Sequence, residues 1–197
     1  GPTDVNTKRV PLVAVMIGVV LVGLLVWARV GRVTSQSPKP GMAQVSSVAD
    51  GDTIDVTLDG HTERVRLLGI DTPETVDPRR PVGCFGPEAS HETKALLPPG
   101  TWVRLERDVE LRDRYGRLLA YVTRMPDKLV VNRHLLAGGF ADTLRIGPNK
   151  AYLADFAAAR NQARAQKLGA WGACPSPFDP RQGASGAPRT GRLHRRA

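Results

Sequence analysis

The stretch Arg66-Leu67-Leu68-Gly69-Ile70-Asp71-Thr72-Pro73-Glu74 decides how the surrounding chain can fold and what it can do. Its aliphatic residues favour a buried strand, and Pro73 ends that strand because proline has no N–H for the sheet. Two carboxylates, Asp71 and Glu74, therefore follow the strand on a stiff turn, with Arg66 behind them. Carboxylates suit a hard cation or a general base, and a guanidinium suits a phosphate. A polar turn after a core strand is the alternative interpretation of this stretch alone.

Charge is unevenly distributed along the 197 residues, whose formal net charge is +9. Residues 1–42 and residues 175–197 each carry +4, and the residues between them carry +1. Net charge therefore gives no argument for a nucleic-acid partner, which has to follow from the positions of individual arginines. The two cysteines, Cys84 and Cys174, are too few for a disulfide-rich scaffold and lack the spacing of a zinc site.

The N-terminal part contains a long apolar run. Residues 10–28 carry no charge, and a run of this length suffices for one membrane-spanning helix. We predict a flank over 1–9, a transmembrane helix over 10–30 and a linker over 31–42. A cleaved signal peptide is the first alternative, but the run is longer than usual and no clear Ala-x-Ala site follows. A buried core helix is the second, and apolar residues on every face disfavour it. Flanking positive charges hardly discriminate between the two orientations.

Residues 43–174 read as the folded domain, and residues 175–197 as a disordered basic tail. Short strands are expected over 42–48, 53–58, 62–70, 101–106 and 118–123, with Asp59-Gly60 as a hairpin turn. Helices are expected over 86–97, 129–137 and 150–168. This pattern predicts an α+β fold: a five-stranded closed β-barrel of the OB type with three helices, preceded by the transmembrane helix.

Two more polar motifs accompany the first stretch, Asp50-Gly51-Asp52-Thr53 and Asp113-Arg114-Tyr115-Gly116-Arg117. Taken singly, they are typical of a hairpin turn and a charged loop. In an antiparallel barrel, however, the first turn and the end of the third strand can meet, so that Asp52 and Asp71 share a divalent ion. Because no Cys or His accompanies them, calcium or magnesium suits the pair better than zinc. Arg117, at the mouth of a strand, can hold a phosphate with two hydrogen bonds.

Together these motifs resemble the thermonuclease (staphylococcal nuclease) family. The resemblance covers residues 43–174 in order and with compatible spacing. It is carried by Asp50-Gly51-Asp52-Thr53, Arg66 to Glu74, Phe85-Gly86-Pro87-Glu88-Ala89, Arg114-Tyr115-Gly116-Arg117-Leu118-Leu119-Ala120-Tyr121, Val131-Asn132, Leu135 to Ala141 and Gly169-Ala170-Trp171.

The resemblance implies a calcium-dependent endonuclease that hydrolyses phosphodiester bonds of DNA and RNA, preferably single-stranded, and leaves 3′-phosphate ends. It implies that Asp52, Asp71 and the Thr72 carbonyl bind Ca²⁺, with Asp50 just behind them. It further implies that Glu74 positions or deprotonates the attacking water. Phosphate and substrate contacts are expected from Arg66, Arg117, Tyr115 and Arg114. A non-catalytic OB module that binds nucleic acid or protein is the alternative, and a membrane-surface interaction protein is a third.

One segment departs from the family pattern. Where the type member has two tyrosines that stack on the nucleotide, residues 142–148 contain no aromatic side chain. We therefore expect weaker nucleotide binding, with Arg145 substituting through a cation–π or phosphate contact.

The two cysteines bear on the compartment. Exported members of the family have a pair like Cys84 and Cys174, so the resemblance implies a disulfide, with two free thiols as the alternative. We expect a monomer held in the cell membrane by residues 10–30 in a single pass, with its nuclease domain outside the cytoplasm.

Overall fold

The centre of the fold is one curved sheet that closes on itself. The computed structural model describes residues 41–79, 81–125 and 127–179. All of these belong to one compact unit, Pro38–Ala197. Its elements are β1 (Met42–Asp50), β2 (Thr53–Leu58), β3 (His61–Leu67), β4 (Gly69–Asp71), α2 (Gly86–Leu96), β5 (Trp102–Glu106), β6 (Leu118–Arg124), β7 (Leu129–Val130), α3 (Val131–Ala137), β8 (Asp142–Leu144), α4 (Leu153–Ala165) and α5 (Ala170–Ala173).

Five strands form the barrel in the order β3-β2-β1-β5-β6, and a parallel pairing of β3 with β6 closes it. The long strand β1 pairs with both β2 and β5, and its register with β2 shifts twice. Such bulges bend a strand, which lets β1 follow the curvature of the barrel. Asp59 and Gly60 both have positive φ, 50° and 82°, as a tight two-residue hairpin requires. The predicted five-stranded barrel with three helices is confirmed.

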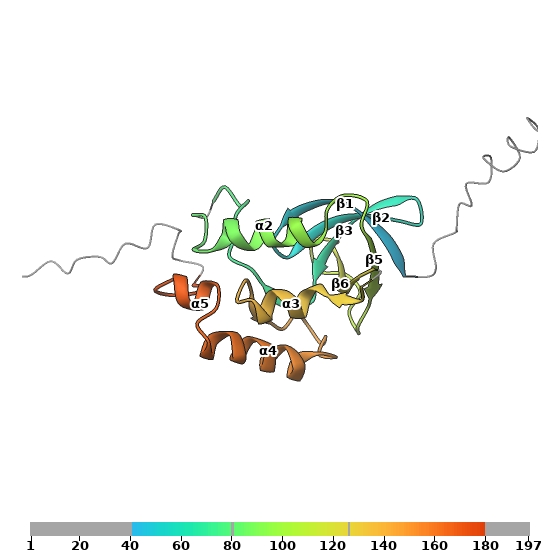
Figure 1. Cartoon of the computed structure of the whole chain (residues 1–197). Helices are drawn as coiled ribbons and strands as arrows, with labels where there is room; N and C mark the ends of the chain where they lie inside the picture. The colour runs from blue at the N-terminus through green and yellow to red at the C-terminus, as the bar shows by residue number, and fades with distance from the viewer. Residues whose placement is uncertain (1–40, 80, 126, 180–197) are drawn as a thin grey trace, which may run out of the picture. The chain divides into compact units, whose positions relative to one another are not determined.

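The helices lie outside the barrel, with α3 between α2 and α4 (Figure 1). Helix α3 packs against β6, and α2 packs against β1. The apolar side chains between barrel and helices form one buried cluster, whose largest fully buried members are Phe156, Ile54, Leu67, Leu68, Ile70, Leu97, Leu119, Leu135, Leu136, Val45, Val56 and Val65.

The predicted strand over 62–70 is broken in the structure. Strand β3 ends at Leu67, and the chain turns at Gly69, whose φ of 78° a side chain would rarely allow. A Cβ on Gly69 would lie 2.7 Å from the ring of Phe156, so α4 packs directly on this bend. Residues 69–71 leave the barrel and pair with β8 instead, with Asp71 opposite Asp142. The bend moves Asp71 away from the barrel sheet and toward the turn between β1 and β2.

Other boundaries differ less. The helix predicted over 129–137 begins at Val131, because residues 129–130 pair with β6 as strand β7. The helix predicted over 150–168 spans Leu153–Ala165. The predicted transmembrane helix over 10–30 and residues 180–197 of the predicted tail lie outside the described residues. Within 41–79, 81–125 and 127–179, no helix has both the length and the apolar character needed to cross a membrane.

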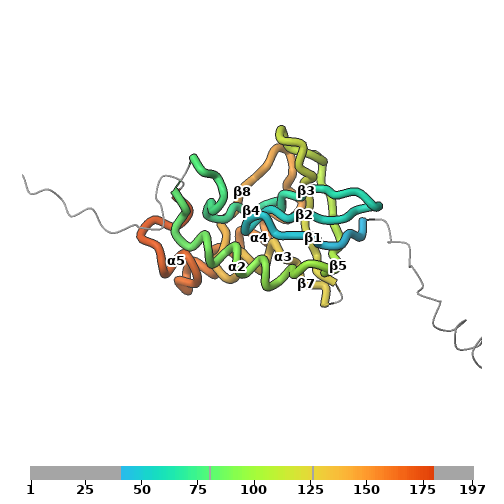
Figure 2. The backbone as a smooth tube through the Cα atoms, turned by 90° about the horizontal axis from the view of Figure 1, so that it is seen from above, coloured from blue at the N-terminus to red at the C-terminus, as the bar shows by residue number. Residues whose placement is uncertain are grey.

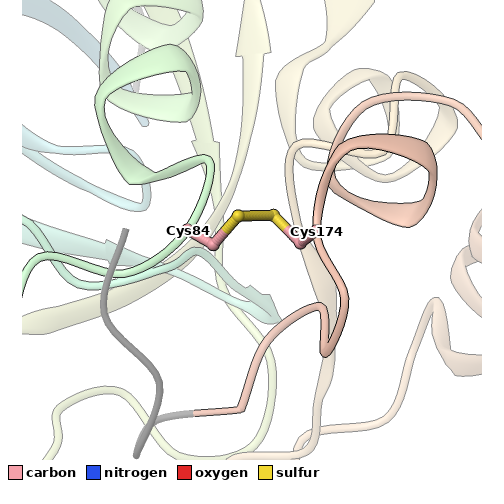
Figure 3. Close-up of a disulfide and its surroundings, with 2 residues drawn as sticks. All are labelled: Cys84 and Cys174. Carbon is pink, nitrogen blue, oxygen red and sulfur yellow. A yellow bond between two sulfur atoms is a disulfide. The ribbon is translucent and has the colours of Figure 1, made fainter. Parts of the chain in front are cut away.

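Cys84 and Cys174 are joined by a disulfide across 90 residues of sequence (Figure 3). The bond links the segment that leads into α2 with the residue that follows α5. Closing a loop of this length stabilises a fold by about 4–5 kcal/mol in the chain-entropy model.

A single buried amide connects α3 to the barrel. The side chain of Asn132 is fully buried, and its Nδ2 donates to the Leu68 carbonyl at 2.8 Å. Its Oδ1 accepts a hydrogen bond from the Val122 N–H, also at 2.8 Å. Asn132 thus provides a hydrogen-bond partner for one backbone group on each of the two segments that it joins.

Replacing Asn132 with leucine is expected to lower the free energy of unfolding by about 2–5 kcal/mol, since two buried backbone groups lose their partner. Urea unfolding followed by circular dichroism measures this loss. The control is Asn161→Leu, at an exposed position of α4, for which we expect a change within about 0.5 kcal/mol. Equal stability of the two variants would contradict the bridging role of Asn132.

Candidate active site

The turn between β1 and β2 packs against the end of β4. The backbone N–H of Thr72 donates to Asp52 Oδ2 at 3.1 Å, across 20 residues of sequence. Gly51 makes this approach possible, because a Cβ there would lie 2.7 Å from Thr72 Oγ1. The two acidic motifs found in the sequence therefore meet in space.

A buried guanidinium joins these motifs. The Arg66 side chain is 5% exposed, and its Nη2 lies 2.9 Å from Asp52 Oδ2 and 2.8 Å from Asp71 Oδ1. Its Nη1 donates to the carbonyls of Leu67, at 2.8 Å, and Ile70, at 2.7 Å. Arg66 thus fixes the bend after β3 and holds the two carboxylates side by side.

The carboxylates create a locally negative site. Burial raises the pKa of Asp71 to about 6; Arg66 opposes this shift, and the charges of Asp52, Glu74 and Asp142 add to it. About half of the Asp71 side chain still reaches solvent, at 54% exposure. A cation that approaches Asp71 from the solvent side would stabilise its ionised form.

Glu74 behaves differently, because backbone groups hold its charge. Its Oε1 accepts hydrogen bonds from three successive N–H groups, those of Thr75 at 3.0 Å, Val76 at 2.8 Å and Asp77 at 3.1 Å. Burial pushes its pKa up, but these bonds and a bond with Asp50 outweigh burial and lower the pKa below the ordinary value. Glu74 is therefore ionised and fixed in one orientation. Burial raises the pKa of Asp50, whose Oδ1 accepts a hydrogen bond from Thr75 Oγ1 at 2.5 Å.

The donors around Asp52 and Asp71 fit an oxygen-liganded divalent cation. Both carboxylates contact the same nitrogen of Arg66, and the nearby Thr72 hydroxyl is buried without a hydrogen-bond partner. In the described part of the chain, no three His, Cys, Asp or Glu side chains gather as a metal group. The protein can thus offer two carboxylates and oxygens of Thr72, and a hard cation completes such a set with water.

A hydrogen bond and a ring contact fix the orientation of the Arg117 guanidinium, a group that suits an anion. Its Nε donates to Asp113 Oδ2 at 2.7 Å, and its guanidinium carbon lies 5.4 Å from the centre of the Tyr115 ring. Asp113 also accepts the backbone N–H groups of Tyr115 and Arg117, so it shapes the whole turn. The sequence motif includes Asp113 but assigns it no role; its spacing of four residues before Arg117 is the signal that could have done so.

One cleft of about 930 Å³ contains most of the predicted residues. Its lining includes Asp52, Arg66, Asp71, Thr72, Glu74, Arg114, Tyr115 and Arg117. Arg145 lies outside this lining, and its Nε donates to the Gly147 carbonyl at 3.1 Å. Sequence reasoning also missed Arg160, whose Nη1 lies 2.9 Å from Asp142 Oδ1 and so balances the carboxylate opposite Asp71.

The fold and the cleft define a class of protein: an OB-type barrel whose carboxylates and arginines converge on one side. A family model described as staphylococcal nuclease homologue matches residues 64–173. The thermonuclease of Staphylococcus intermedius is 44% identical over 127 residues, which are 64% of this chain and 74% of that protein. The Staphylococcus hyicus thermonuclease is 43% identical over 128 residues, covering 65% and 74%. The SPbeta prophage-derived endonuclease YokF of Bacillus subtilis (strain 168) is 42% identical over 124 residues, covering 62% and 41%. The chain belongs to the staphylococcal nuclease family.

Asp71 is expected to titrate with a midpoint near pH 6 in protein kept free of divalent ions by a chelator. Because this pKa lies above that of an unfolded aspartate, the stabilisation from Asp71 is present at low pH and is lost as the pH rises through 6. Carbon NMR of the side-chain carboxyl groups measures the midpoint. Asp55 is the internal control, since its hydrogen bond with Arg64 holds its pKa below the ordinary value. Titration of Asp71 together with Asp55 would contradict this electrostatic description.

Proposed function

We propose that this chain is a calcium-dependent endonuclease that hydrolyses phosphodiester bonds of DNA and RNA, with single strands preferred and 3′-phosphate ends as products. One observation carries the proposal: the buried guanidinium of Arg66 holds Asp52 and Asp71 together in a cleft that Glu74 and Arg117 also line. The family supports it, since relatives are thermonucleases and an endonuclease.

The residues that would hold Ca²⁺ are Asp52, Asp71 and Thr72. The bound ion would offset negative charge that builds on the phosphoryl group. Two carboxylates beside a buried arginine carry a net negative charge, and they lie open to solvent on the Asp71 side. A dication at this point suits the charge of the site as well as its donors.

Side chains of the protein can accept the proton of the attacking water and stabilise the charge that builds on the phosphoryl group. Glu74 is ionised and oriented by three N–H groups, so it can accept a proton from the water that attacks phosphorus. Arg66 and Arg117 are guanidinium groups fixed before substrate binds, which is the arrangement that stabilises charge in a transition state. As the bond from phosphorus to the 5′ oxygen breaks, Arg117 donates a hydrogen bond to the leaving oxygen, which takes its proton from solvent.

The test is cleavage of denatured DNA in calcium or in chelator. We expect cleavage by the wild type in calcium and a fall of about 10²–10⁴-fold for Glu74→Gln, because the base is lost. Arg117→Lys should lose about 10²–10³-fold, because lysine cannot reproduce the fixed fork. Glu88→Gln, at an exposed position of α2, is the matched control and should cleave like the wild type. Binding of nucleic acid without any cleavage by the wild type would instead favour the non-catalytic module.

Calcium binding can be tested without reference to cleavage. Isothermal titration of the chelator-treated protein with CaCl₂ is expected to show one site, weakened tenfold or more in Asp52→Asn because a charged ligand becomes neutral. Asp55→Asn is the control, since Asp55 faces Arg64 at 2.8 Å on the same hairpin and does not line the cleft. Equal calcium affinity of the two variants would overturn the metal assignment.

We also propose that residues 10–30 tether the domain to the cell membrane in a single pass, with the domain outside the cytoplasm. The uncharged apolar run over residues 10–28 supports this proposal. The Cys84–Cys174 disulfide is of the kind that persists in oxidising compartments. We expect the full chain to stay in the membrane pellet after an alkaline carbonate wash and to be degraded by protease added to intact cells. Release by carbonate, or protection from protease, would contradict the tether or its orientation.

A further inference from the structure

The cleft extends beyond the residues that the proposed function uses. At one end lies the turn of Tyr115 and Arg117, together with Leu144, Ile146 and Gly147. The other end, which we call the disulfide end, is lined by Val76, Asp77, Arg79, Pro81, Gly83, Cys84, Ser176, Phe178 and Asp179. Figure 2 shows the segment before α2 beside α5. Glu74 lines the same cleft.

Two contacts place the C-terminal wall of the disulfide end. The Cys84–Cys174 bond joins the chain after α5 to the segment that carries Glu74 and leads into α2 (Figure 3). Four residues later, the Phe178 ring packs against Trp171, with ring centroids 4.9 Å apart. The Arg164 guanidinium lies 5.6 Å from the centre of the Trp171 ring. The disulfide at Cys174 therefore ties the segment that carries Phe178 to the cleft, and the ring of Phe178 itself packs on Trp171.

Phe178 is an aromatic surface in a cleft that has few of them. Among the described residues that line the cleft, the aromatic side chains are Tyr115 and Phe178. The Tyr115 ring already contacts two guanidinium groups, those of Arg114 at 4.8 Å and Arg117 at 5.4 Å. Strand β8 adds Leu144 to the lining but no ring. A base at the disulfide end would therefore find its aromatic partner in Phe178.

The other side chains at the disulfide end add apolar surface and charge around Phe178. Val76 is 62% exposed and gives apolar surface on the opposite segment of the same end. The Arg79 side chain is 86% exposed, and its Nε and Nη2 both donate to Asp77, at 2.9 Å and 3.0 Å. A ring beside an apolar wall is the part of a single-strand binding surface that stacks a base. Arg79 is paired with Asp77, and Asp179 also lines this end, so the inference rests on stacking and not on phosphate contacts.

We propose that the disulfide end is a second nucleotide subsite, in which a base of the single-stranded substrate stacks on Phe178. This base belongs to the side of the scissile phosphate opposite the nucleotide at Tyr115. The inference rests on the proposed function, because an endonuclease must hold nucleotides on both sides of the bond it cuts. The disulfide serves the subsite by keeping the 176–179 segment at the cleft.

The first experiment measures kcat/KM on oligonucleotides of increasing length around one cleavable bond. For Phe178→Ala we expect kcat/KM to fall about tenfold or more on substrates that reach the disulfide end, the size of one lost stacking contact. It should equal that of the wild type on substrates truncated on that side. Phe178→Trp should restore activity because it keeps a stacking ring. Trp102→Ala, which removes an exposed ring outside the cleft lining, should behave as the wild type at every length.

The second experiment measures stacking in the absence of cleavage. The Glu74→Gln protein is titrated into oligonucleotides that carry 2-aminopurine at one position in turn, since this base loses fluorescence when it stacks. At one position beside the scissile phosphate, we expect quenching that disappears when Phe178→Ala is added. Replacing both cysteines with serine should weaken the same quenching, provided that circular dichroism shows a folded barrel.

The outcomes separate the subsite from the proposed function. Cleavage by the wild type with equal length dependence in Phe178→Ala, and with no position that loses quenching, would overturn the subsite and leave the nuclease in place. Absence of both cleavage and binding by the wild type would overturn the two together. A loss confined to long substrates, rescued by Phe178→Trp, establishes the subsite.

Discussion

The structure depends on one buried positive charge. The Arg66 side chain is 5% exposed, and a guanidinium taken out of water costs several kcal/mol unless its donors are bonded. Here it binds two carbonyls at the bend after β3 and two carboxylates from different motifs. The same group therefore determines the shape of the backbone and the distance between Asp52 and Asp71. Removing it would leave the buried carboxylate of Asp52 facing the half-exposed carboxylate of Asp71 without compensation.

Neighbouring groups fix the orientation of each charged side chain of the site, both on the barrel strands and on the irregular segments. Asp52 and Arg66 sit on barrel strands or their tight turn, where Gly51 allows close packing against Thr72. Glu74 lies on an irregular segment, yet three consecutive N–H groups fix its orientation. Arg117 stands on a turn that Asp113 organises through three hydrogen bonds. Each charged group is thus oriented before any ligand arrives, which spares the cost of ordering it later.

This member of the staphylococcal nuclease family arranges its cleft walls in its own way. On β8, Asp142 lies opposite Asp71 and is balanced by Arg160 on α4, while Leu144 is the β8 residue that lines the cleft, so β8 adds no aromatic ring to the lining. At the other end, the disulfide and Trp171 bring Phe178 to the cleft. Composition predicts a disordered tail over residues 175–197, of which residues 175–179 are described, because it offers few side chains to bury. Their placement follows from a bond and a ring contact that join distant parts of the chain.

By itself, the sequence determined the local elements and the kinds of residue in the site. Alternating apolar positions and the Asp59-Gly60 turn gave the barrel strands, and the order of the acidic and arginine motifs gave the family. It also marked the separate motifs that contain Asp52, Asp71 and Glu74. Only the tertiary structure decided that the third strand breaks at Gly69, that Arg145 stays outside the cleft lining and that Asp113 orients Arg117. These features depend on packing across the fold, such as Phe156 against Gly69, and on hydrogen bonds whose partners compete in three dimensions. Local sequence patterns report backbone preference and periodicity, and they contain no information about such contacts between distant segments.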